Sequence, residues 1–576
     1  MSGDGYTNYG RAKEAADAVD RQIINAIESD TSFLVEAGAG AGKTYSLNKT
    51  VEWLEDNRWG EYKSRKQRIA CITYTNAAVD VIKARLRPDS VVTPSTIHSF
   101  AWSSMAQYQS TISELVIKLG LLPAGVNSDD YDKVSYSIGV RYVDDDTLYL
   151  SHSDIIKLFS EMLDKQKFRV ALNREYPIIL IDEYQDSSRL IVDKIVRYFI
   201  AKKEGPIFGF FGDAWQTIYA SNGACGMIEH ANLQVIKKTS NFRSAPRIVE
   251  FLNKVRPQLQ QISASDGFVG EVLAVHCDDF QEDRESKGVF KGDLPSDELK
   301  RRLNSVKQRF SESSFGNEES LKVLMLTHRL LSEQQGYENL LKLLGAAFKS
   351  GDDDVLNYFL EVIEPIYAAL ESKDTKPLCD ALGTKRVLIE CKRHKRDWRS
   401  LREQLSKARK ATVRDLLQVL KSNQHLIPIS ETVQSVIRAV SDNPSEDYRN
   451  GTVEDLANLS YAEFISAKRF FDPAGFYSTD HGVKGQEYDN VIFVIGSGWN
   501  LYNFQRNIPR IDEAVSDDRV KRGIERNRNL FYVCCSRPRK RLLLFITQKV
   551  TKEFQDYLVG TLGSENYYSY SEYMQK

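Results

Sequence analysis

The chain lacks two features that would point directly to a class of partner, namely a long hydrophobic run and an excess of charge of one sign. Its 576 residues contain 78 Lys and Arg against 79 Asp and Glu, so the formal net charge is −1. No run of about 18 apolar residues occurs, and the polar N-terminus has no apolar signal segment. We therefore expect a cytoplasmic protein without a membrane partner, in which any nucleic-acid contact comes from a local basic patch.

Cysteine is scarce as well. The seven cysteines form no C-x-x-C pair, and Cys534 and Cys535 stand together in an apolar run. Isolated cysteines in apolar surroundings argue against a zinc or iron–sulfur site and are typical of a reducing compartment. The sequence also has no carboxylate cluster with the spacing of a nuclease site, so any cutting of nucleic acid would come from a partner.

The sequence does contain a series of short, strongly apolar runs. With 42% apolar residues it can form a sizeable core, and its length fits about three or four domains. The runs are rich in β-branched and aromatic residues and alternate with helical patterns, which is typical of doubly wound parallel sheets. They comprise residues 32–37, 68–75, 176–183, 205–213, 321–328, 490–496 and 541–547. Two gaps, at about 103–170 and 329–470, predict mainly helical insertions into two α/β cores.

Residues 35–47 read VEAGAGAGKTYSL, which places Gly38, Gly40 and Gly42 directly before Lys43 and Thr44. Glycine leaves backbone N–H groups open to an anion, and the strand–loop–helix order puts that anion at a helix N-terminus. In such a loop the lysine reaches the β- and γ-phosphates, and the threonine hydroxyl ligates Mg²⁺. The strict pattern has Gly where Ala37 stands, and the alternative is an ordinary Gly/Ala-rich turn.

A second apolar run, IILIDEYQDSS, ends in Asp182 and Glu183. Carboxylates at the C-terminal end of a parallel strand lie where open α/β sheets bind ligands. Asp182 suits Mg²⁺, and Glu183 suits the base that orients the attacking water. Gln216, in the turn after FFGD, can sense a γ-phosphate or that water. The alternatives are a pair of surface acids and a solvated glutamine.

In their order along the chain, these and further blocks resemble the motifs of superfamily 1A DNA helicases of the UvrD, Rep and PcrA type. AGAGAGKT (37–44) resembles their Walker A loop, in which Ala at the first position is normal. The other blocks are DRQIINAI (20–27), CITYTNAAVDVIKARL (71–86), TPSTIHSFAW (93–102), IDEYQDSS (181–188), GDAWQTIY (212–219), TSNFRS (239–244), STDHGVKGQEYDNVIFV (478–494) and LFYVCCSRPRKRLLL (530–544). The sequences IDEYQDS and TSNFRS also resemble motifs of compact UvrD-like subunits of antiphage defence systems, the GajB type.

This resemblance implies an ATP site with Mg²⁺ between two RecA-like cores. The implied hydrolysis residues are Lys43, Asp182, Glu183, Gln216, Arg243 and Arg537, with Thr44 and Asp182 as metal ligands. The implied nucleotide contacts are Gln22 with the adenine, Gly38, Gly40, Gly42, Lys43 and Thr44 with the phosphates, Phe242 stacked on the base, and Glu487 on the ribose. His481 and Lys484 belong to the same coupling motif. Because the arginines and the phosphate loop lie on different cores, ATP would close the cleft between them.

The resemblance also implies a track for single-stranded DNA, made of phosphate donors and stacking rings. Its implied residues are Thr73, Tyr74, Thr75, Asn76, Thr96, His98, Tyr219, Thr479 and His481. One departure from the family follows Tyr219, where Ser221 stands in place of a tryptophan that would stack on a base. Trp215 is a nearby ring that could take its place.

The resemblance further implies four parts of the chain. Residues 1–104 with 168–240 form core 1A, 105–167 insertion 1B, 241–330 with 470–576 core 2A, and 331–469 insertion 2B. The densest basic stretch, residues 391–414, lies in insertion 2B. We interpret it either as a contact with duplex phosphates or as a solvated helix face or partner surface.

Two functions fit these motifs best. The first is an ATP-dependent DNA helicase that moves 3′→5′ on single strands and opens duplex junctions. The second is a DNA-stimulated ATPase or single-strand sensor that unwinds poorly alone and serves a partner nuclease, contacted through residues 331–469, in antiphage defence. An RNA substrate and a small-molecule kinase or other P-loop NTPase are further alternatives. The last leaves four blocks unexplained, namely CITYTNAAVDVIKARL, TSNFRS, STDHGVKGQEYDNVIFV and LFYVCCSRPRKRLLL.

Overall fold

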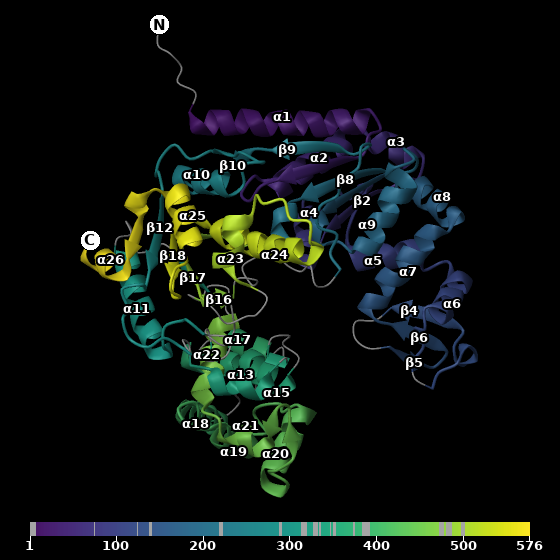
Figure 1. Cartoon of the computed structure of the whole chain (residues 1–576). Helices are drawn as coiled ribbons and strands as arrows, with labels where there is room; N and C mark the ends of the chain where they lie inside the picture. Colours follow the sequence, from purple (N-terminus) through teal and green to yellow (C-terminus); the bar gives the residue numbers. More distant parts are fainter. Residues whose placement is uncertain are drawn as a thin grey trace.

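The computed structural model of the chain contains two α/β cores that lie side by side, with two smaller lobes attached to them (Figure 1). It describes residues 7–73, 75–123, 125–136, 141–217, 223–286, 291–312, 320–325, 332, 336–345, 347–348, 353–372, 375–382, 392–471, 477–479, 486–496 and 502–576. The predicted α/β class with two doubly wound parallel-sheet cores is confirmed.

The first core is built on a six-stranded sheet with the order β3-β2-β7-β8-β1-β9, in which all neighbours are parallel. Its strands are β1 (Phe33–Ala37), β2 (Ile69–Thr73), β3 (Val92–Thr96), β7 (Ile178–Asp182), β8 (Ile207–Gly212) and β9 (Gln234–Lys238). The four central strands are the apolar runs that the sequence predicts. The edge strands β3 and β9 were missed, because an edge strand has one neighbour and tolerates Pro94 or alternating exposed residues.

The second core repeats this architecture with the strand order β16-β13-β17-β18-β12-β19, again all parallel. Its strands are β12 (Glu271–His276), β13 (Leu321–Met325), β16 (Tyr477–Thr479), β17 (Tyr488–Ile495), β18 (Pro538–Ile546) and β19 (Tyr567–Ser569). Helices α10 (Pro246–Val255), α11 (Ser296–Glu312), α24 (Asp518–Cys535), α25 (Lys552–Leu562) and α26 (Tyr570–Gln575) surround this sheet.

The segment between α5 (Ile97–Met105) and α8 (Gln166–Glu175) forms the smaller lobe attached to the first core. It contains two helices, α6 (Gln109–Lys118) and α7 (His152–Asp164), and a three-stranded sheet of β4 (Lys133–Tyr136), β5 (Tyr142–Asp144) and β6 (Thr147–Leu150). The sequence analysis did not predict this sheet, because strands of three or four residues are too short to show a hydrophobic period.

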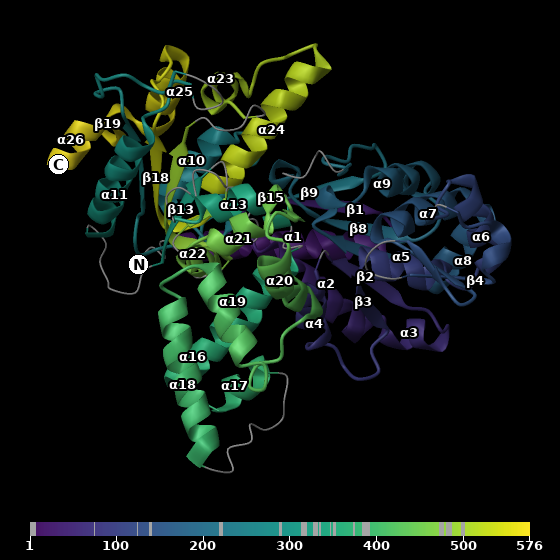
Figure 2. The same cartoon turned by 90° about the horizontal axis from the view of Figure 1, so that it is seen from below.

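The second lobe is almost entirely helical and extends away from both cores (Figure 2). Its helices include α13 (Glu338–Leu344), α15 (Asp354–Asn357), α16 (Glu364–Ser372), α17 (Thr375–Ala381), α18 (Lys392–Ala408), α19 (Val413–Ser422), α20 (Glu431–Asp442), α21 (Val453–Asn458) and α22 (Tyr461–Phe471). The basic helix α18 buries Trp398, Leu401 and Leu405 on one face, in a hydrophobic core that is continuous with Leu543 and Phe545 of the second sheet. This lobe is therefore packed onto the second core and is not a separate globule.

Helix α1 (Asn8–Glu28) crosses the top of the molecule and packs against α2 (Lys43–Asn57) and β9. Ser46 of α2 donates to Asp20 of α1 at 2.5 Å, and Lys49 forms an ion pair with the same carboxylate at 3.0 Å. None of the helices in the described part of the chain has the length and apolarity that a membrane span requires.

A glycine in the first sheet provides a test of how tightly this core is packed. A Cβ atom added to Gly209 of β8 would lie 2.5 Å from Phe33 Cζ and 2.8 Å from Leu180 Cδ2. We expect Gly209→Ala to destabilise the first core by about 1–3 kcal/mol, because neither neighbour can move away inside the sheet. Gly60→Ala is the control, since Gly60 lies exposed in helix α3 (Trp59–Ser64) with no atom within 4 Å of its added Cβ. Calorimetric unfolding should show a lower midpoint for Gly209→Ala and an unchanged or higher one for Gly60→Ala.

Candidate nucleotide site

The phosphate loop lies between the end of β1 at Ala37 and the start of α2 at Lys43. Gly40 and Gly42 have φ of 73° and 75°, in the left-handed region that favours glycine. Within the described residues, no protein acceptor takes the backbone N–H groups of Gly40, Gly42, Lys43 or Thr44. Several donors without a protein acceptor therefore lie together at a helix N-terminus, as an anion site requires.

Lys43 and Glu183 form an ion pair, with Nζ and Oε2 2.7 Å apart. Burial works against the charged form of Lys43, but Glu183 and Asp182 outweigh it and raise the pKa of the ammonium. Glu183 has φ of 48°, a left-handed backbone conformation that is uncommon for a non-glycine residue. Residues of this kind gather at active sites, and Glu183 lies directly after β7.

Asp182 is the last residue of β7, and its Oδ1 accepts from the Glu183 backbone N–H at 3.0 Å. Burial, followed by the Glu183 charge, raises the pKa of Asp182 to about 6, and Lys43 opposes this shift. A carboxylate and the Thr44 hydroxyl are hard oxygen donors of the kind that Mg²⁺ takes together with nucleotide phosphates. The residues present therefore fit a magnesium ion.

The second core supplies the opposite wall. Arg537 is only 1% exposed, and its Nη2 donates to Gln216 Oε1 at 3.4 Å and to Ser536 Oγ at 3.0 Å. Burial, followed by the neighbouring Arg243, lowers the pKa of Arg537 to about 10. Arg243 lies 3.4 Å from Glu487, and the same carboxylate is 3.1 Å from Arg539. Two guanidinium groups thus share one small, desolvated region.

These residues enclose a cavity of about 400 Å³ between the two cores. Its lining unites the predicted residues Gly38, Gly40, Gly42, Lys43, Thr44, Glu183, Gln216, Phe242, Arg243, Glu487 and Arg537. Gln22 is exposed on α1, and neither Gln22 nor Asp182 lines the cavity. The structure therefore brings most of the predicted nucleotide residues to one place, from parts of the chain about 500 residues apart.

Two exposed aromatic rings stand at the mouth of this cavity. Phe242 is 44% exposed and Tyr45 57% exposed, although both side chains are large and apolar. A Cβ atom added to Gly42 would lie 3.8 Å from an atom of each, so both side chains lie next to this glycine. Phe242 also contacts Tyr9 of α1 edge to face, with ring centroids 6.3 Å apart. The predicted base-stacking Phe242 thus belongs to an exposed aromatic group, and Tyr45 is a member that the sequence analysis did not single out.

The sequence analysis also missed a buried polar layer between the cores. Arg256, at the end of α10, lies 2.6 Å from Glu36 of β1 and 2.8 Å from Asp213 after β8. The Tyr532 hydroxyl accepts from the Ala39 backbone N–H at 3.2 Å. The available signal was Glu36, a single acidic residue in an otherwise apolar strand, whereas Arg256 lies outside every motif.

Trp215 does not replace the absent stacking tryptophan, and that expectation is wrong. Its side chain is only 8% exposed and lies between two guanidinium groups, 5.0 Å from Arg256 and 4.2 Å from Arg528. The ring also packs edge to face on Tyr532. It is a buried component of the inter-core interface.

Apart from Thr479 of the second sheet, the described residues of the predicted DNA track gather where β2 and β3 end. Thr75 caps α4 (Asn76–Lys83), Asn76 is exposed, Thr96 caps α5, and Thr73 is buried with its hydroxyl bonded to Thr75 O. His98 stacks on His152 of the first lobe, with ring centroids 3.7 Å apart. Thr479 is the last residue of β16. Tyr74, Tyr219, Ser221, His481 and Lys484 lie outside the described residues.

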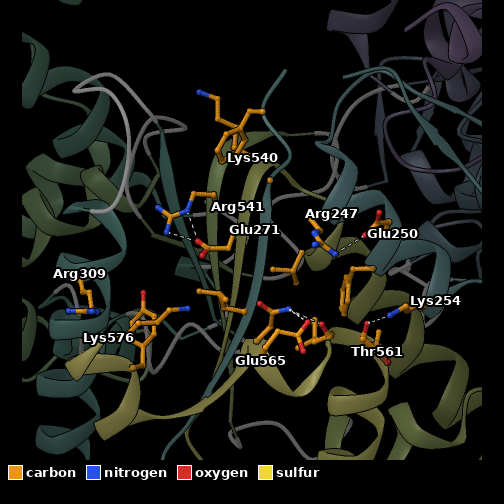
Figure 3. Close-up of a pocket in the computed structure, with 18 of the residues that line it drawn as sticks. Arg247, Glu250, Lys254, Glu271, Arg309, Lys540, Arg541, Thr561, Glu565 and Lys576 are labelled. Carbon is orange, nitrogen blue, oxygen red and sulfur yellow. Dashed lines mark hydrogen bonds and ion pairs between the residues drawn. The ribbon is translucent and has the colours of Figure 1, made fainter. Parts of the chain in front are cut away.

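A larger cavity, of about 900 Å³, lies beside α10, β12 and β18 (Figure 3). Its cations are held by partners of their own. Arg541 pairs with Glu271 at 2.8 Å, Arg247 with Glu250 at 3.3 Å, and Lys254 donates to the Thr561 carbonyl at 2.8 Å. Its glycine, Gly270, is followed by a strand and not by a helix N-terminus. It has none of the phosphate-loop features of the smaller cavity.

The fold and the shared cavity, with a phosphate loop on one parallel sheet and arginines on another, resemble those of a helicase-type ATPase. Comparison with known proteins agrees. A family described as an AAA domain matches residues 20–222, which include the phosphate loop, β7 and Gln216. The chain is 23% identical to Gabija protein GajB of Bacillus cereus (strain HuB5-5) over 678 aligned positions, covering 92% of this chain and 95% of that protein. The resemblance to UvrD-like helicases, including the GajB type, is confirmed.

The histidine stack makes the first core sensitive to acid. Burial, followed by His152, lowers the pKa of His98 to about 4, and the Tyr136 hydroxyl bonds to His152 on its other side. The unfolded chain therefore takes up this proton first, so stability falls as the pH drops from about 6.5 toward about 4. We expect His98→Gln to weaken this dependence of the thermal midpoint. His425→Gln, at an exposed histidine, is the control, and equal slopes for all three proteins would contradict the prediction.

The exposed rings should control nucleotide affinity. Base stacking on an aromatic ring contributes about 1–3 kcal/mol, so we expect Phe242→Ala to weaken binding of a non-hydrolysable ATP analogue about 5- to 150-fold. Phe242→Tyr should bind normally. Titration calorimetry measures both, with Val235→Ala, at an exposed residue of β9, as the control. Unchanged affinity in Phe242→Ala would exclude this ring as the base platform.

Proposed function

We propose that the protein is an ATP-dependent DNA helicase or translocase that moves 3′→5′ along single-stranded DNA. The observation that carries this proposal is the shared cavity, in which a phosphate loop from one sheet faces Arg243 and Arg537 from the other. A nucleotide bound there would touch both cores at once, so its charge would control their separation. The 3′→5′ polarity rests on the resemblance to UvrD-like helicases.

Hydrolysis would begin when Lys43 leaves Glu183 and binds the nucleotide phosphates. In the structure this ammonium holds Glu183 at 2.7 Å. Nucleotide phosphates bound to the loop would compete for Lys43, which frees the Glu183 carboxylate to accept a proton from the attacking water. Arg537 and Arg243 would stabilise the charge that develops on the γ-phosphoryl group, with Gln216 beside them.

Thr44 and Asp182 would hold a magnesium ion, which supplies neutralisation of phosphate charge when it is bound with ATP. Phe242 and Tyr45 would hold the base at the mouth of the cavity. When phosphate leaves, the second core loses its anion and the two sheets can separate.

Single-stranded DNA would lie across the ends of β2 and β3, where Thr75, Asn76, Thr96 and His98 gather. The basic helix α18 keeps Lys395, Arg396 and Arg399 on its exposed side, while its apolar side is buried. These cations suit the phosphates of a duplex ahead of the motor and predict a strong dependence of binding on salt.

A second candidate function is a DNA-stimulated ATPase that unwinds poorly alone and acts with a partner nuclease in antiphage defence. The similarity to Gabija protein GajB along nearly the full length of both chains favours it. The buried position of Trp215 favours it too, because it leaves the track without that stacking ring. The helical lobe formed by residues 331–469 is the surface that we assign to the partner.

The two candidates are separated by hydrolysis and unwinding assays on the same protein. We expect single-stranded DNA to stimulate ATP hydrolysis. Lys43→Ala, Glu183→Gln and Arg537→Ala should each lower turnover by about 100-fold or more, because each removes charge or a base from the reacting phosphate. A forked duplex with a 3′ tail should be unwound, and one with a 5′ tail should not.

Lys49→Ala is the matched control, since Lys49 lies on the same helix but pairs with Asp17 and Asp20 of α1, and it should hydrolyse ATP normally. Stimulation without unwinding would favour the partner-dependent ATPase. A rate of ATP hydrolysis that does not change when single-stranded DNA is added would contradict both candidates.

A further inference from the structure

An ion triad is buried where the two cores meet. Arg256 of the second core is 1% exposed, and its two Nη groups serve different carboxylates of the first core. Nη2 donates to Glu36 Oε1 at 2.6 Å, and Nη1 donates to Asp213 Oδ1 at 2.8 Å. Glu36 lies in β1, directly before the phosphate loop, and Asp213 lies directly after β8. One guanidinium therefore connects two neighbouring strands of the first sheet to the second core.

Asp213 also binds Gln216, so it connects Arg256 to this glutamine. Its Oδ2 accepts from Gln216 Nε2 at 2.9 Å, while its Oδ1 accepts from Arg256 and from the Trp215 backbone N–H at 3.0 Å. A carboxylate can only accept, so it orients the amide with the NH₂ toward Asp213 and the carbonyl Oε1 toward Arg537. The direction of the Gln216 carbonyl in the cavity thus depends on the position of the Asp213 carboxylate.

A second branch runs from Asp213 to the hydrolytic base. The Asp213 backbone N–H donates to Gln185 Oε1 at 3.1 Å, and Gln185 Nε2 donates to Glu183 Oε2 at 2.5 Å. Glu183 Oε2 is also the atom that faces Lys43. Gln185 and Asp213 are both fully buried, so neither can exchange these bonds for water. Arg256 is therefore connected through Asp213 to two short chains of hydrogen bonds, one that reaches Gln216 and one that reaches Glu183.

Rings hold the guanidinium in its position. Its carbon lies 5.0 Å from the centroid of Trp215 and 5.4 Å from that of Tyr532, and Tyr532 bonds to Ala39 in the phosphate loop. Trp215 is itself covered by Arg528 on another side. This packing restricts the movement of Arg256. A residue that positions other groups must itself be held in place in this way.

We propose that Arg256 is a positioning residue for ATP hydrolysis, which orients Gln216 and Glu183 through Asp213 when the two cores are together. Arg256 does not line the nucleotide cavity and acts only through these partners. Because it comes from the second core, contact between the cores would complete the hydrolytic arrangement on the first. This inference rests on the proposed ATPase function.

A double-mutant cycle tests it on the full chain. Arg256→Met should lower the turnover number for ATP at least about tenfold, while the KM for ATP changes less than about threefold, because the phosphate loop is not touched. In a Gln216→Ala background, the same substitution should lower turnover by a clearly smaller factor, since only the branch to Glu183 is then left to lose. If Arg256 merely stabilised the fold, the losses in the two backgrounds would be equal.

Arg256→Lys keeps a cation at this position but cannot bridge both carboxylates, so it should fold and still lose turnover. This variant keeps the test decisive if Arg256→Met does not fold. Arg302→Met is the matched control. Arg302 is 6% exposed in the second core and pairs with Glu298 at 2.6 Å and Asp279 at 2.7 Å, away from the cavity. It should lower the thermal midpoint and leave turnover within about twofold.

Wild-type turnover in both Arg256 variants, or equal losses with and without Gln216, would overturn the positioning role while the ATPase function stands. A wild-type protein that does not hydrolyse ATP would overturn the proposed function, and the positioning role with it.

Discussion

Burial of charge between two sheets is the constraint on which the rest of this structure depends. A cation removed from water needs a carboxylate or a bound anion beside it. Arg256 meets that need with Glu36 and Asp213, so it holds the cores together through groups that belong to the protein. Arg243 and Arg537 instead face the cavity from the second core. The same interface therefore contains a fixed ion triad and a pair of cations placed to respond to an anion.

The two lobes are attached so that movement between the cores reaches them. The helical lobe shares its hydrophobic core with the second sheet, through Leu543 and Phe545 on one side and Leu401 and Leu405 on the other. A rotation of the second sheet would carry this lobe along as one packed body. The smaller lobe contacts the first core through the His98–His152 stack, next to the ends of β2 and β3. Each lobe thus follows a different core.

Much of this arrangement is readable from local sequence. Central strands such as β7 and β8 are covered on both faces, so they must be apolar throughout and stand out as uninterrupted runs. The phosphate loop can also be predicted from local sequence, because Gly40 and Gly42 adopt the left-handed backbone that favours glycine. Edge strands are harder to predict, since their exposed residues interrupt the apolar run. Strands of three residues are too short to show a pattern.

The sequence by itself determined the two parallel-sheet cores, the loop around Lys43 and the order of the motifs, because each of these depends on residues close together in the chain. Only the tertiary structure decided that Trp215 is buried between two arginines and that Arg256 reaches Glu36 across 220 residues. Tertiary packing likewise made Asp213 the link between Gln216 and Gln185. Such roles come from pairing distant charges in a shared, water-free interface, and no local pattern records which partner a buried charge will find.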